Sequence, residues 1–148
     1  MFQEKKEKSF KPKEENSKKE KKESLDTEVG EVVTCLMNAS ISLHKLHLKV
    51  TGIGSYALHN ALNGYDKFHD FADDLAESFQ GASEKLIKTS EELPKVLDDK
   101  QDAISFLNYV KDEVTSLQNK MPYSEIVNQL DTVKEHINGM KYKIMFLS

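Results

Sequence analysis

Four segments with helix-period apolar residues, separated by two short connections and one long one, most constrain the fold of this 148-residue chain. Apolar positions three and four residues apart predict amphipathic helices over residues 26–50, 55–79, 99–120 and 123–147. About four residues join the first two segments and two or three join the last two, so each pair must be antiparallel. The stretch from Gln80 to Asp98 is long enough to cross the whole length of a bundle.

Two helical hairpins joined by one long crossover form the ferritin-like arrangement rather than an up-down-up-down bundle. We therefore predict an all-α fold, a ferritin-like four-helix bundle, for residues 26–148. Asp26 or Thr27 is predicted to cap the first helix, and Gly81 to end the second. A short helix over residues 83–89 is predicted within the crossover.

The N-terminal segment differs from the rest in composition. Residues 1–24 carry nine lysines and six glutamates, net +3, whereas the remainder is net −7. Residues 1–25 contain too few apolar side chains to offset their ordering entropy, so we predict a disordered tail. Its lysines are candidates for non-specific DNA contact, unless the tail only maintains solubility. They are Lys5, Lys6, Lys8, Lys11, Lys13, Lys18, Lys19, Lys21 and Lys22.

The composition argues against several classes of protein. The chain has no arginine, whose planar fork reads guanine, so base-specific DNA readout is not expected. The single cysteine, Cys35, excludes an internal disulfide and is predicted to be a buried, inert thiol. No apolar run approaches the roughly 18 residues that span a bilayer. We expect a soluble, cytoplasmic protein with no membrane partner, a description that includes a virus-encoded protein made in a host cytoplasm.

Two histidines indicate a candidate metal site. His47 and His59 lie on either side of a glycine-containing turn, so a helical hairpin would bring their side chains together. Carboxylates follow at helical spacing along the second helix, and imidazole with carboxylate favours iron, zinc or manganese. These are Asp70, Asp73, Asp74 and Glu77. The alternative is a solvated acidic face beside two hydrogen-bonded histidines. No role is assigned to His44, His69 or His136.

Residues from about Ile41 to Gly81 resemble the ferritin-like Dps family, the DNA-binding proteins from starved cells. The resemblance rests on His47-Leu48-Lys49-Val50-Thr51-Gly52, Leu58-His59, Leu62-Asn63-Gly64-Tyr65 and Asp73-Asp74-Leu75-Ala76-Glu77. It implies a homo-oligomeric shell, usually a dodecamer, that oxidises Fe(II) and stores the mineral. A dimer is expected if the shell does not form.

In that family the iron site lies between two subunits. The resemblance implies that His47 and His59 come from one subunit and an acidic pair from the other. That pair is Asp73 and Glu77 if one residue is deleted, or Asp74 and Ser78 without a gap. The acid that normally follows the second histidine by four residues is Asn63 here. The candidate metal ligands are therefore His47, His59, Asp73, Asp74 and Glu77, and no catalytic residue is assigned.

Two main functions follow from these residues, beside a third, a small helical-bundle inhibitor or adaptor with a disordered interaction tail, which would be a monomer or dimer. The first is a Dps-like iron-binding, ferroxidase and storage protein whose lysine-rich tail contacts DNA. The second is a catalytically degenerate ferritin-like bundle with a structural, assembly or partner-binding role. Asn63 and Ser78, which replace expected carboxylates, motivate the second function.

Overall fold

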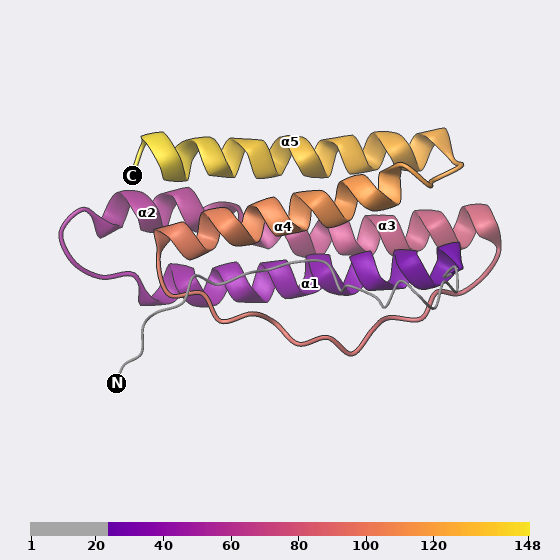
Figure 1. Ribbon diagram of the computed structural model, residues 1–148, viewed down its shortest axis with the longest axis horizontal. Helices are drawn as coiled ribbons and strands as arrows, with labels where there is room; N and C mark the ends of the chain where they lie inside the picture. The colour runs from indigo at the N-terminus through magenta and orange to yellow at the C-terminus, as the bar shows by residue number, and fades with distance from the viewer. Residues whose placement is uncertain (1–23) are drawn as a thin grey trace, which may run out of the picture.

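The computed structural model describes residues 24–148, and this part of the chain contains helices but no strand (Figure 1). Its elements are α1 (Leu25–Lys49), α2 (Ser55–Ala61), the 3₁₀ helix η2 (Leu62–Asp66), α3 (Lys67–Ser83), α4 (Lys100–Gln118) and α5 (Ser124–Phe146). The all-α prediction is confirmed. The predicted DNA-contacting lysines, and all but two residues of the predicted tail, lie outside the described residues.

Two helical hairpins make up the bundle. Helix α1 packs antiparallel to α3, and α4 packs antiparallel to α5 (Figure 1). After α3 the chain returns along the length of the bundle before it enters α4. This path agrees with the connection lengths in the sequence, which required one crossover between two antiparallel pairs.

The first helix begins slightly earlier than predicted. The side chain of Ser24 accepts a hydrogen bond from the backbone N–H of Thr27, at 3.4 Å, and so acts as the N-cap. The predicted caps Asp26 and Thr27 instead lie in the first turn. There the negative carboxylate of Asp26 interacts favourably with the positive end of the helix dipole. Leu25, which was predicted to belong to the tail, is helical.

The predicted single helix over residues 55–79 is divided into α2, η2 and α3. The division occurs where Gly64 approaches α5. The ring Nε2 of His136 donates a hydrogen bond to the Gly64 carbonyl at 2.9 Å, and a β-carbon on Gly64 would meet both His136 and Met140. Gly81 does not end α3, which continues to Ser83.

The core lies between the helices and is formed by apolar residues that recur at helical spacing. Fully buried examples are Leu36, Leu43, Phe68, Leu75, Phe106, Val110, Val114, Ile126, Leu130, Ile137 and Ile144. Cys35 is also buried, and burial raises the pKa of its thiol far above the ordinary value. The thiol is therefore protonated and inert at neutral pH, as predicted.

The crossover, residues 84–98, is extended and is called the strap here; the short helix predicted over residues 83–89 is absent. Its main chain bonds to side chains of α1 instead of to itself. The bonds join Ser90 N to Thr34 Oγ1 (2.9 Å), Asn38 Nδ2 to the Glu92 carbonyl (2.8 Å) and Lys95 N to Ser42 Oγ (2.9 Å). The three α1 residues are four positions apart, so they share one face of the helix.

Candidate functional site

His47 and His59 meet where α1 turns into α2. The Nδ1 atom of each ring lies 3.0 Å from the backbone carbonyl oxygen of the other residue. The two rings are stacked, with centroids 3.8 Å apart and planes at 24°. This reciprocal arrangement, called the histidine clamp here, confirms the prediction that a hairpin brings the two side chains together.

The hydrogen bonds of the clamp determine which ring nitrogens carry protons. A carbonyl oxygen can only accept, so Nδ1 must be the protonated nitrogen in both His47 and His59. In a neutral ring the other nitrogen, Nε2, then holds a lone pair. Neither Nε2 atom is hydrogen-bonded within residues 24–148. Neither is fully buried, so both remain accessible. The clamp therefore presents two nitrogen ligands.

Burial keeps the more enclosed ring neutral. His47 is only 8% exposed, and burial lowers the pKa of its imidazole. The bond to the His59 carbonyl opposes this shift, whereas charge on His59 or His44 would lower the pKa of His47 further. His47 is thus mainly the neutral base at pH 7, the protonation state that a metal ligand requires.

The turn between the two histidines depends on two glycines. Gly52 and Gly54 have φ values of 102° and 84°, which residues other than glycine rarely adopt. The hydroxyl of Ser55 donates to the Gly52 carbonyl at 2.6 Å and closes the turn. The tight reversal places His47 and His59 on facing turns of α1 and α2.

Further rings extend the stack beyond the clamp. His44 stacks on Tyr65 with centroids 4.0 Å apart and planes at 9°, and Tyr65 also lies 5.2 Å from His47. The ring centroids of Tyr56 and His59 lie 6.4 Å apart. The sequence assigned no role to His44. Its position three residues before His47 is the signal that could have placed it beside the site.

The carboxylates do not join the histidines within one chain. Asp73, Asp74 and Glu77 are exposed on α3, and so is Asp70. No group of three or more potential metal ligands exists in the described part of the chain. Of the five predicted ligands, one copy of the protein therefore brings together only His47 and His59. Ser78 is bonded to Gln129 at 2.7 Å, and Asn63 is exposed.

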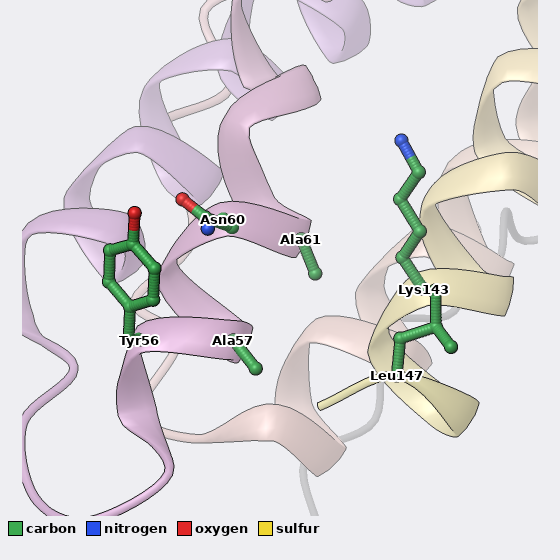
Figure 2. Close-up of a pocket in the computed structure, with 6 residues that line it drawn as sticks. All are labelled: Tyr56, Ala57, Asn60, Ala61, Lys143 and Leu147. Atoms are coloured by element: carbon green, nitrogen blue, oxygen red, sulfur yellow. The ribbon is translucent and has the colours of Figure 1, made fainter.

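A cleft opens near the clamp, between α2 and the end of α5 (Figure 2). It has a volume of about 370 Å³ and is lined by Tyr56, Ala57, Asn60, Ala61, Lys143 and Leu147. Most of the lining is apolar. The sequence did not indicate this cleft, because its two walls are separated by about 80 residues.

Fold and site together define an all-helical bundle with a paired-histidine hairpin. The chain belongs to the Family of unknown function (DUF5856), whose model matches residues 47–144. The match begins at His47 and extends through most of α5. No curated protein matches the chain. Among residues 24–148, no helix has both the length and the hydrophobicity that crossing a bilayer requires.

Proposed function

We propose that this protein is a Dps-like iron-binding protein that takes up Fe(II) as its substrate, with His47 and His59 as the first two ligands. The observation that carries this proposal is the tautomer of the clamp. Both Nδ1 atoms are engaged with carbonyl groups, which leaves both Nε2 lone pairs for a metal ion. The same bonds fix the orientation of each ring, as a hydrogen bond from the other ring nitrogen does for histidine ligands in metal proteins.

The remaining ligands would come from a second copy of the chain. Two imidazoles alone make a weak site, and iron favours added carboxylates. Asp73, Asp74 and Glu77 are exposed and form no ion pair with other described residues, so α3 can offer them across an interface. The Dps resemblance implies the same division of ligands between subunits. The proposal therefore includes a homo-oligomer, either a dodecamer or a dimer.

An anaerobic Fe(II) titration, combined with a mass measurement of the same sample, tests this proposal. The most informative variant is His59→Asn, because an asparagine amide can replace the Nδ1–H donor while it removes Nε2. We expect this variant to fold but to bind Fe(II) at least tenfold more weakly. The control is His69→Asn, which changes an exposed histidine on α3 and should bind normally. Absence of bound metal in the unmodified protein would reject the proposal.

The carboxylate half needs its own experiment. Asp73→Asn combined with Glu77→Gln should weaken Fe(II) binding by the oligomer while the clamp and the fold persist. Asp112→Asn, which changes an exposed carboxylate on α4, is the control. Unchanged binding in the double variant would show that Asp73 and Glu77 do not complete the site.

A metal-free structural bundle is the second candidate function. The observation that favours it is that the described residues contain no group of three potential ligands. In this case the clamp would only join α1 to α2. A metal-free dimer whose histidine variants lose stability but no metal affinity would select this function.

Contact with DNA through the tail is a separate proposal. Nine lysines would neutralise phosphates, so binding should weaken steeply as salt is added. Deleting residues 1–23 leaves the α1 cap at Ser24 in place and should abolish this binding. Equal DNA binding by the shortened chain would reject the proposal.

A further inference from the structure

The cleft between α2 and α5 exists because small side chains face the end of α5. Ala57 and Ala61 lie one helical turn apart, and their methyl groups point toward the gap (Figure 2). Leu147 lines the opposite side, although its side chain remains 57% exposed. At about 370 Å³ the cleft is near the lower end of the roughly 300–1,000 Å³ typical of ligand pockets. It therefore suits a small apolar group.

A single cation stands at this apolar cleft. The side chain of Lys143 extends from α5 along the gap, so its methylene groups add to the apolar wall (Figure 2). Its ammonium group makes no ion pair with any residue in 24–148. The amide of Asn60 and the hydroxyl of Tyr56 supply further polar atoms at the α2 side. The charge of Lys143 is thus available to an anion.

We propose that this cleft binds a small amphiphilic carboxylate, an aliphatic chain or ring that carries one carboxyl group. The apolar part would lie against Ala57, Ala61 and Leu147, and the carboxylate would pair with Lys143. The chain after residue 24 is net acidic, so general attraction would not concentrate an anion here. Recognition must come from the local pairing of one lysine with an apolar wall. This site does not depend on the histidine clamp.

Calorimetric titration with decanoate, kept below its micellar concentration, tests the proposal. We expect saturable binding at one site per chain. Lys143→Met keeps the length and apolar stem of the side chain but removes its charge, and should weaken binding about tenfold. Lys141→Met on the same helix is the matched control and should bind as the unmodified protein does. Decylamine, with the same chain and the opposite charge, should not bind.

A second variant tests the place of binding. Ala57→Leu fills the cleft from a half-buried position of α2 with a good helix former, so the fold should persist and decanoate binding should be lost. Circular dichroism verifies the fold of each variant. The proposal is overturned by absence of saturable decanoate binding, by equal binding in Lys143→Met or Ala57→Leu, or by decylamine binding as tightly. Fe(II) affinity should stay unchanged in both variants, which separates this result from a failure of the proposed metal site.

Discussion

Gly30 of α1 lies against the carbonyl group of Lys88 in the strap, with no room for a β-carbon between them. The next residues on the same face of α1, at intervals of four, are Thr34, Asn38 and Ser42, which bond to the strap main chain. One face of α1 is therefore occupied by an extended segment instead of by another helix. Packing at Gly30 and the hydrogen bonds of Thr34, Asn38 and Ser42 hold the strap against α1.

Gly30→Ala should destabilise the protein although alanine is the better helix former. The added methyl group overlaps the Lys88 carbonyl oxygen, so the strap must move away from α1. We expect a net loss of about 1–3 kcal/mol in the free energy of unfolding. Urea denaturation measures this loss, and faster hydrogen exchange at the Ser90 and Lys95 amides would locate it. Unchanged stability would mean that the strap is not held at Gly30.

Gly139→Ala should have the opposite effect. Gly139 lies inside α5, and a β-carbon there would meet no atom within 4 Å. Only the helix propensity then changes, and alanine should stabilise the protein by about 0.5–1 kcal/mol. The same urea experiment checks this value. The two glycine variants form a matched pair, because the backbone effect is shared and only the surroundings differ.

His47→Ala should be strongly destabilising. The substitution removes a buried ring, leaves the His59 carbonyl without its partner and breaks the ring stack. We expect a loss of about 2–4 kcal/mol. His47→Asn, which can retain the bond to the carbonyl, should lose less, and His69→Ala should change stability by less than about 0.5 kcal/mol. Equal losses for the alanine and asparagine variants would argue against the clamp bond.

Stability should fall in mild acid because of His47. Burial lowers the pKa of this imidazole in the folded protein, so the unfolded chain binds more protons as the pH drops. The contribution of neutral His47 is complete above about pH 6.5, the pKa of an unfolded histidine, and is lost as the pH falls toward the lower folded pKa. The difference in unfolding free energy between the unmodified protein and His47→Asn, measured from pH 5 to 8, should shrink in acid. A constant difference would contradict the assigned protonation state.

Cys35 should be unreactive in the folded protein. Its thiol is buried, and desolvation raises the pKa of Cys35 so far that almost no thiolate exists at neutral pH. A thiol reagent such as 5,5′-dithiobis(2-nitrobenzoate) should react slowly under native conditions and at once in denaturant. Rapid native reaction would show that α1 opens locally.

Most of the fold could be predicted from local sequence because it depends on local signals. The apolar periodicity of each helix and the lengths of the connections specify four helical segments and one crossover. The break at η2 could not be predicted, since Gly64 contacts His136, which is 72 residues away. The conformation of the strap was also inaccessible, because its bonds come from Thr34, Asn38 and Ser42, all more than 50 residues away.

The candidate site was predictable only in part for the same reason. His47 and His59 are 12 residues apart across a glycine turn, so their meeting follows from the hairpin alone. The stack of His44 on Tyr65 depends on how α1 packs against η2, and no local pattern specifies that register. Asp73 and Glu77 are exposed on α3, and the pattern of one chain does not specify which residues of a second copy would meet them.

Surface connections usually tolerate insertions and deletions, whereas the contacts of the strap with α1 restrict its length. Its partners on α1 step by four helical residues, about 6.0 Å, while the strap advances two extended residues, about 6.6 Å, from Lys88 to Ser90 and on to Glu92. Since α1 holds the strap by its main chain, most substitutions at the exposed positions between residues 86 and 93 should be tolerated, whereas Ile87 packs against the core and should be restricted. An insertion or deletion of one residue would shift every later contact. Members of this family should therefore differ in the exposed residues of the strap but keep its length.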